Sequence, residues 1–491
     1  MRRCGSITIF MVMSLTMVMS LFFSMSEVVR YFCMKSTAHT LAASAAQSGL
    51  GDYNRLLYEE YGILAVDMGY GGAAADEQKL VSRMTSYASE GGDPSHDRGI
   101  IKYVNLCRMY PTDTKLDKVT LLTDYKGAGF MKEAAAQAKY DIPMELIEKW
   151  EDAGRAAQGV TAAGYVPDRT LLSASVIDAV EHRVYVTGSR GGRVSGEDES
   201  LEIVDAVESF RKRGVLYQVL GSDMGVSGGR ITSMDRVSKR SLNRGDAEEK
   251  NLTVSDKLLY KLWLLDRLGC YTDRRERANM NYELEYVVSG NLTDEENLRS
   301  VVKKLLALRE AENLVALSSD GARRSEAEGL AAAASAALMN PELEPVITMA
   351  ILSSWAYVES VLDVRLLLSG GRVPLIKEPS NWTSNLATLP EYLNTDVKAI
   401  DVSSGIDYKG YLFAFMCVTP SARLGLRPLD LMEEELHQNE DYVNVRMDNM
   451  MIEGTYHVKM SGSPLFLSMA PLVSTKLSVY EYTEEPILSY L

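Results

Sequence analysis

Residues 6–26 read SITIFMVMSLTMVMSLFFSMS and contain no charged side chain. From this stretch to residue 47 the chain has neither glycine nor proline. At a rise of ~1.5 Å per residue, a helix over residues 6–26 would cross the ~30 Å hydrocarbon core of a bilayer. The sequence therefore predicts a single-pass protein of the cell membrane, with the lipid bilayer as the partner of its N-terminal helix.

A cleaved signal peptide, a lipoprotein signal and a buried soluble helix are the alternatives to a membrane span. A cleaved signal has an apolar core of ~7–15 residues with small residues at its exit, whereas this run is longer and is followed by EVVRYF at residues 27–32. A lipoprotein would carry its cysteine just after the core, but Cys4 precedes the core and Cys33 follows Arg30. Because soluble helices rarely need ~18 uncharged residues in a row, we expect the helix to stay attached to the mature protein.

The segment after the span keeps a helical pattern. Apolar and small residues recur at spacings of three and four, and residues 38–48 are rich in alanine and serine. We therefore predict a short tail at residues 1–5, a transmembrane helix at 6–26 and an amphipathic juxtamembrane stalk helix at 27–50. Two glycines then end the helix.

An apolar helix that continues into an amphipathic helix and then into a globular head is the layout of type IV pilins and pseudopilins. GSITIF at residues 5–10, followed by the span, and DYNRLLYEEYGILAVD at residues 52–67 resemble a family of uncharacterised Gram-positive proteins. That family is similar to the TadE/TadG-like minor pseudopilins of Tad (Flp-type) pilus systems. Its other recurring blocks resemble residues 283–290, 293–309, 350–365 and 370–375.

The resemblance supplies an orientation that charge alone does not. Arg2 and Arg3 before the span are balanced by Arg30 and Lys35 after it, so the positive-inside rule barely discriminates. The family layout implies a cytoplasmic N-terminus and an extracytoplasmic head. It also implies, as partners, other single-span pilus proteins or the pilus platform, against which the small residues of the stalk would pack. The shared motifs are structural and imply no catalytic residue.

One position departs from the pilin pattern. Pilins have a glutamate five residues after the glycine at which they are processed, and this glutamate pairs with a neighbouring N-terminal amine during fibre assembly. Counted from Gly5, the position holds Phe10, and the nearest acid, Glu27, lies at the other end of the span. We interpret Glu27 as a solvated interfacial charge. Because an intramembrane acid would be a strong functional sign, its absence favours an accessory component over the main fibre subunit.

The head, residues 51–491, is long enough for two or three subdomains. Polar, glycine-bearing stretches near residues 188–196 and 221–249 are the predicted flexible segments. The net charge of −15 and the isoelectric point near 5.0 argue against nucleic acid as a partner, since nucleic acid attracts concentrated Lys and Arg.

The five cysteines, Cys4, Cys33, Cys107, Cys270 and Cys417, contain no C-x-x-C pair. Their odd number and wide spacing indicate neither a disulfide framework nor a zinc site. Single bridges among Cys107, Cys270 and Cys417 stay open, but buried free thiols are the expectation, because isolated cysteines often behave as small apolar residues.

The head is predicted to be α+β, with an antiparallel sheet assembled from distant strands around a mainly helical centre. Period-two patterns and β-branched runs predict strands near residues 101–107, 118–122, 282–288, 408–418, 442–447 and 477–482, with a turn at 111–113. Apolar periodicity predicts helices near residues 76–89, 129–140, 143–152, 198–219, 326–339 and 340–368. Thr293 and Glu296 form a capping box that opens a further helix, and Gly370 ends the last one.

No motif with a known chemistry is present. The histidines have no mutual ligand spacing, and H-E-x-x-H, G-x-S-x-G and the Walker phosphate loop are missing from the sequence. GVSGG at residues 225–229 is interpreted as a flexible turn. The acidic residues at 248–249 and 433–435 are interpreted as solvated faces, because they lack the alternating oxygen ligands of a calcium loop. We therefore predict no catalytic, cofactor-binding or metal residue and no cofactor.

The sequence favours a noncatalytic envelope protein, a pseudopilin-like accessory component of a Tad-type pilus or secretion system. The alternative is a membrane-anchored extracytoplasmic enzyme or ligand-binding receptor, whose site forms only in three dimensions. A pocket in the head with converging titratable groups would favour this alternative.

Overall fold

The computed structural model describes residues 4–92, 106–141, 199–220, 225–246, 248–249, 251–275, 277, 279–469 and 479–490. The chain divides into two compact units. Unit 1 consists of Met1–Ala138, Asp235–Lys257 and Leu436–Leu491, and unit 2 of Lys139–Met234 and Leu258–Glu435. Each unit is thus assembled from segments that are distant in sequence. The predicted flexible segment 188–196 and the predicted helix 143–152 lie outside the described residues.

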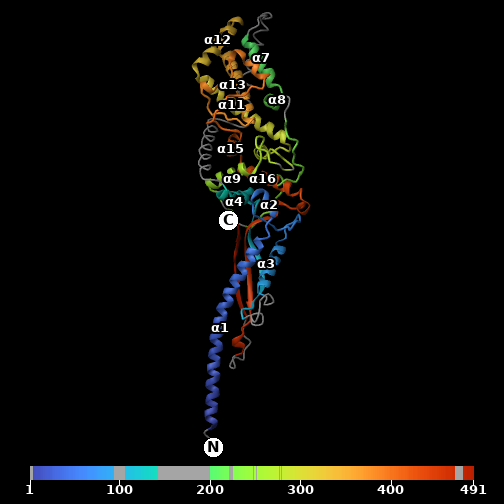
Figure 1. Cartoon of the computed structure of the whole chain (residues 1–491), viewed down its shortest axis with the longest axis vertical. Helices are drawn as coiled ribbons and strands as arrows, with labels where there is room; N and C mark the ends of the chain where they lie inside the picture. The colour runs from blue at the N-terminus through green and yellow to red at the C-terminus, as the bar shows by residue number, and fades with distance from the viewer. Residues whose placement is uncertain are drawn as a thin grey trace. The chain divides into compact units, whose positions relative to one another are not determined.

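Unit 1 begins with α1, Cys4–Leu50, one uninterrupted helix of 47 residues that is blue in Figure 1. Its apolar stretch near the N-terminus is unburied, with side chains such as Phe10 (73% exposed) and Met17 (74% exposed) open to the surroundings. The predicted N-terminal apolar helix is confirmed, and its length and composition are compatible with membrane anchoring. The second helical stretch that is long and apolar enough to span, Pro341–Leu368, is instead 78% buried within the protein.

An antiparallel sheet forms the second part of unit 1. Its central strand is β3, Met450–Gly462, which pairs with every other strand of the sheet. These partners are β1 (Val66–Asp67), β2 (Tyr110–Leu121), β4 (Tyr480–Glu484) and β5 (Ile487–Ser489). The register places Leu116 opposite Tyr456, and Met460 opposite Tyr482. An antiparallel sheet of distant strands is thus confirmed, although it lies in unit 1 and most of the helices form unit 2.

The second half of α1 packs on this sheet together with α3, Glu77–Gly92 (Figure 1). Side chains alternate along β3, and Tyr456, Val458 and Met460 are fully buried in the core that these two helices share. Where α1 ends, a Cβ on Gly49 would lie 2.7 Å from Cγ and 2.8 Å from Sδ of Met84, so a larger residue would require the Met84 side chain to move.

The small residues of α1 are part of the same core. Ala38, Ala42, Ala45 and Ala46 are at most 3% exposed and pack within unit 1. The interpretation that they would pack against partner helices is therefore wrong, because the sheet and α3 of the same chain already cover them.

Unit 2 is built around α13, Glu344–Leu368, which is buried along almost its whole length. It packs against α11 (Asp294–Ser319) and α12 (Gly321–Ala337), as Figure 1 shows. The predicted start of α11 is confirmed, with Thr293 as its N-cap residue: the Glu296 amide donates a hydrogen bond to Oγ1 of Thr293 (3.3 Å). Gly370, with φ of +89°, follows α13 as predicted.

Shorter elements complete the two units. Unit 1 also holds α2 (Arg55–Tyr61), most of α4 (Asp124–Asp141), α17 (Phe466–Met469) and the 3₁₀ helices η6 (Glu440–Tyr442) and η7 (Met447–Asn449). In unit 2 lie α7 (Glu199–Arg211), α8 (Val215–Leu220), α10 (Glu283–Ser289), α14 (Leu389–Leu393), α15 (Tyr408–Val418), η3 (Pro341–Leu343), η4 (Pro379–Asn381) and η5 (Leu386–Thr388). Helices α9 (Val254–Arg267) and α16 (Ser421–Leu436) lie mostly in unit 2.

Three predicted strands are wrong. Residues 282–288 form α10, where Glu283 and Glu285 are as buried as their apolar neighbours, so the polar and apolar alternation does not mark two faces. Residues 408–418 form α15, which is buried on most sides and is capped by Asp407, whose Oδ1 accepts from the Gly410 amide (2.8 Å). Residues 442–447 are mostly short turns between η6 and η7.

The bounds of other predicted elements differ from those in the structure. The predicted turn at 111–113 is an irregularity within β2, and the predicted helix 198–219 is divided into α7 and α8 at Gly214. Residues 225–246 contain no helix and no longer strand, but backbone hydrogen bonds join them to their own units, including Ile231 N to Leu292 O (3.0 Å) and Asp246 N to Val119 O (3.0 Å).

Candidate functional site

The part of unit 1 next to the apolar stretch of α1 is organised by Glu27, the first charged residue after the uncharged run. Its carboxylate accepts hydrogen bonds from the amides of Leu465 (3.1 Å), Phe466 (2.5 Å) and Leu467 (3.2 Å). Glu27 is 2% exposed, so the interpretation of a solvated interfacial charge is wrong. The carboxylate instead fixes the turn after β3 to the end of the apolar stretch.

Arg30 completes this anchor. Its Nη1 lies 3.0 Å from Oε1 of Glu27 and donates to the carbonyl oxygen of Ser463 (2.8 Å), while Nε donates to that of Leu106 (2.5 Å). One guanidinium thus neutralises Glu27 and joins α1 to the segments that flank β2 and β3. We call Glu27, Arg30 and their partners the Glu27–Arg30 anchor. Tyr31 follows it and packs edge-to-face on Tyr480, with ring centroids 5.5 Å apart.

Two thiols meet beside the anchor. Because Arg30 holds Leu106, the next residue, Cys107, lies against Cys33 on α1, and the two thiols are hydrogen-bonded. Burial and this hydrogen bond raise the pKa of Cys107 to about 11. Cys33, Cys107, Cys270 and Cys417 are free thiols, and none of the three bridges left open from the sequence is formed.

Oxidation should join Cys33 to Cys107. With copper–phenanthroline and oxygen as the oxidant, the two thiols would lose two electrons and two protons and form one disulfide. We expect proteolysis after oxidation to release the peptides with these two residues joined. Cys270 and Cys417 should stay reduced, become alkylated once the oxidised protein is denatured, and serve as internal controls. Recovery of both peptides as unlinked thiols would contradict the contact described here.

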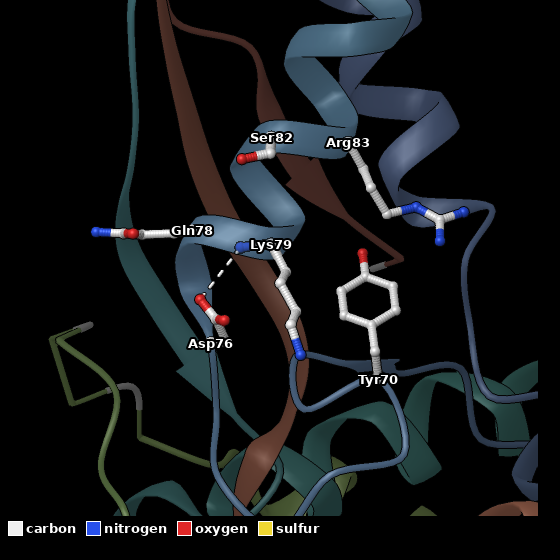
Figure 2. Close-up of a pocket in the computed structure, with 6 residues that line it drawn as sticks. All are labelled: Tyr70, Asp76, Gln78, Lys79, Ser82 and Arg83. Carbon is white, nitrogen blue, oxygen red and sulfur yellow. Dashed lines mark hydrogen bonds between the residues drawn. The ribbon is translucent and has the colours of Figure 1, made fainter.

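An open depression of about 600 Å³ lies elsewhere on unit 1, lined by Tyr70, Asp76, Gln78, Lys79, Ser82 and Arg83. Figure 2 shows that these side chains do not converge, since Gln78 and Ser82 point away from Tyr70. The Arg83 guanidinium is paired with Asp52 (2.8 Å) and stacks on the Tyr70 ring (5.1 Å to its centroid). Burial raises the pKa of the Tyr70 hydroxyl, so it is a poor base at neutral pH. Asp76 also accepts a hydrogen bond from the Lys79 amide (3.3 Å), so several of the polar side chains that line the depression take part in structural contacts.

Unit 2 buries a cluster of charged side chains that sequence reasoning did not identify. Arg309, Glu359, Asp363 and Lys377 have fully buried side chains. Arg309 donates to Asp363 (3.0 Å), and Lys377 is paired with Asp363 (2.6 Å) and Glu359. We call these four residues the buried charge cluster.

Glu359 and Arg309 of the cluster also make hydrogen bonds to the surrounding chain. Glu359 accepts from the amide and hydroxyl of Ser384 (2.9 and 2.6 Å), and Arg309 donates to the carbonyl oxygens of Pro374 and Leu375 (3.0 Å each). These bonds attach the segment after α13 to α11 and α13. The cluster therefore organises the core of unit 2.

Other buried carboxylates also bind backbone amides. Asp294 accepts from the amides of Asn281 (3.0 Å) and Tyr282 (3.1 Å). Glu434 accepts from the Thr232 amide (3.0 Å), and Glu433 and Glu434 are each 4% exposed, so the interpretation of a solvated face is wrong at these two positions. Acids that a sequence search would test as catalytic or metal-binding thus fix loops in place.

The histidines make separate contacts. His39 lies beside Glu484 (2.9 Å), His437 hydrogen-bonds the Val445 carbonyl (2.8 Å), and His457 lies between Asp117 and Glu485. His96 and His182 are outside the described residues. Within the described ranges, no three His, Cys, Asp or Glu side chains are grouped so that they could hold a metal ion.

Comparison with known proteins identifies a family. The model of a family of unknown function, DUF5702, matches residues 193–462, which is more than half of the chain, so the chain belongs to this family. The matched region contains the buried charge cluster and β3 but not α1. No curated protein and no solved structure matches the chain.

Proposed function

We propose that this DUF5702 protein is a membrane-anchored, noncatalytic protein of the cell envelope, and an accessory, pseudopilin-like component of a Tad-type pilus or secretion system. The observation that carries the proposal is α1, a single helix with an exposed apolar first half and a second half that packs on an antiparallel sheet. The first half would cross the bilayer, and the second half would be the stalk that joins it to an extracytoplasmic head.

The Glu27–Arg30 anchor supports this division of α1. It lies where the uncharged run ends, and it gives the helix rigid contacts to the segments around β2 and β3. A membrane helix held in this way would transmit its position in the bilayer to the sheet. Such coupling suits a component that must present a head at a fixed height above the membrane.

The noncatalytic role is supported by the use of buried acids. Glu359, Asp294 and Glu434 each accept backbone amide hydrogen bonds, so their charges serve to hold loops and helices. Arg309 and Lys377 compensate Asp363 and Glu359 within the core. The proteins with which the head assembles are proposed to be other single-span pilus proteins or the pilus platform.

Carbonate extraction and protease protection test the anchoring. We expect the intact chain to stay in the membrane pellet at alkaline pH, because ~20 apolar residues are buried in lipid. In intact protoplasts, added protease should degrade the head. Release of full-length chain by carbonate would contradict the anchor, and protection of the head until lysis would contradict its extracytoplasmic side.

In-cell photo-crosslinking tests the assembly role. The exposed residues Val29 (70%) and Phe32 (63%) are suitable positions for the crosslinker, whereas Ala38 and Ala45 are buried. We expect these positions to capture single-span pilus proteins or the platform protein, with the exposed Met339 of unit 2 as the control position. Capture of unrelated proteins only, together with a hydrolytic activity of the purified protein that one point mutation abolishes, would favour the enzyme alternative.

A further inference from the structure

The end of β3, the turn that follows it and the short helix α17 together have the composition of a membrane-contacting segment; the part after β3, with the start of α17, is called the turn below. Residues 461–469 read SGSPLFLSM and contain no charged side chain. Leu465, Phe466 and Leu467 are consecutive and only partly buried, although most apolar side chains of this unit are in the core. Three adjacent, partly exposed apolar side chains are suited to contact with an apolar phase.

The position of this turn along α1 identifies that phase. The amides of Leu465, Phe466 and Leu467 are hydrogen-bonded to Glu27, which directly follows the uncharged run of residues 6–26. If that run fills the hydrocarbon core, the turn lies at the boundary between acyl chains and headgroups. Strand β3 leads away from this boundary, and β5 pairs with its residues Glu453 to Thr455, at a distance from the turn.

Charge near the turn is already compensated. Glu27 and Arg30 are 2% and 8% exposed and are paired with each other, so neither would be an isolated charge at the apolar boundary. Tyr31, Tyr480 and Tyr482 pack together next to the anchor, with ring centroids 5.4 to 5.5 Å apart. Tyrosine is enriched where a membrane protein meets the headgroup region.

We propose that Leu465, Phe466 and Leu467 form a second membrane contact, which inserts into the interface of the same bilayer that α1 crosses. This inference rests on the proposed anchoring of α1. With two attachments to the same bilayer, α1 and this turn, the tilt and rotation of α1 relative to the membrane would be more restricted than with α1 alone. The turn would thus set the orientation of the sheet above the lipid surface.

Tryptophan fluorescence of the full-length protein in vesicles tests the contact. Phe466→Trp would be reconstituted into phosphatidylcholine and phosphatidylglycerol vesicles with and without brominated acyl chains. We expect a blue-shifted contribution from Trp at 466, relative to the parent protein, and a loss of its intensity in the brominated vesicles. Ile487→Trp is the matched control, because Ile487 is 70% exposed and lies on β5 opposite Thr455, which is well before the end of β3 that leads to the turn. It should show neither effect.

The outcomes separate the two proposals. If the parent protein does not float with vesicles, the anchoring by α1 fails. If it floats but Trp at 466 behaves like Trp at 487, the anchoring stands and the second contact is overturned. Leu465→Trp and Leu467→Trp provide the same measurement if Phe466→Trp does not fold, and an unquenched signal from both would also overturn the proposal.

Discussion

Replacing Arg309 by methionine should lower the free energy of unfolding of unit 2 by about 3–5 kcal/mol, the usual cost of leaving a buried charge without its partner. Arg309 is fully buried, and it compensates Asp363 while donating to the carbonyl oxygens of Pro374 and Leu375. Methionine has a similar volume but no donor. The carboxylate and the carbonyl oxygens would then lose hydrogen bonds that water cannot replace.

Urea denaturation of the full-length protein in detergent, followed by tryptophan fluorescence, measures this loss, because Trp355 and Trp382 lie next to the cluster in unit 2. Arg324→Met is the control. It removes an arginine that pairs with Glu328 (2.8 Å) on the exposed face of α12, so it should leave the unfolding midpoint unchanged. Equal midpoints for the two variants would show that the buried charge cluster does not stabilise unit 2.

A double-mutant cycle measures the interaction between Arg309 and Asp363 separately from the contacts that each makes with other groups. Arg309→Met and Asp363→Asn should each destabilise the protein, and the double variant should lose less than the sum of the two. The reason is that each single change leaves one excess charge in the buried charge cluster, whereas the double change keeps its positive and negative charges equal in number. Additive losses would place the stabilising effect of Arg309 in its contacts with the carbonyl oxygens.

Local patterns in the sequence were sufficient to predict several elements of the fold. The uncharged run predicts α1, Thr293 and Glu296 predict the start of α11, and Gly370 predicts the end of α13. Each of these signals needs only residues within one or two helical turns. The strand predicted at residues 408–418 failed because burial on most sides of a helix removes the 3.6-residue periodicity on which the distinction depends.

The contacts of the candidate site could not be predicted in the same way. Glu27 was interpreted as solvated because its partners, the amides of residues 465–467, are more than 400 positions away in the chain. Lys377 and Glu359 likewise belong to segments whose approach depends on the packing of α11 and α13. An acidic residue beside an uncharged run carries no sequence signal for burial, and only the tertiary structure supplies its partner.

Glu285→Gln should make the protein more stable at alkaline pH and leave it nearly unchanged at acidic pH. Glu285 is fully buried, and this burial raises the pKa of its carboxyl to about 7, although the Tyr271 amide and the Tyr408 hydroxyl both donate to it (2.8 Å each). In the unfolded chain the same carboxyl has a pKa near 4.5. The unfolded state therefore ionises first as the pH rises.

Because the carboxyl ionises at a lower pH in the unfolded state than in the folded state, the free energy of unfolding falls as the pH rises. Below about pH 4.5 the Glu285 carboxyl is neutral in both the folded and the unfolded state, so it does not change the free energy of unfolding. Between about pH 4.5 and about pH 7 it ionises only in the unfolded state. The free energy of unfolding therefore falls by about 3 kcal/mol over this range. Glutamine can accept both hydrogen bonds and does not ionise. The difference in unfolding free energy between Glu285→Gln and the parent should therefore grow by about 3 kcal/mol from about pH 4 to about pH 8. Urea titrations at several pH values would measure this difference in unfolding free energy. Glu391→Gln, at an exposed position, is the control, and its difference from the parent should not change with pH. A difference that stays constant with pH would mean that Glu285 ionises equally in both states, and that its contacts with Tyr271 and Tyr408 fully offset its burial.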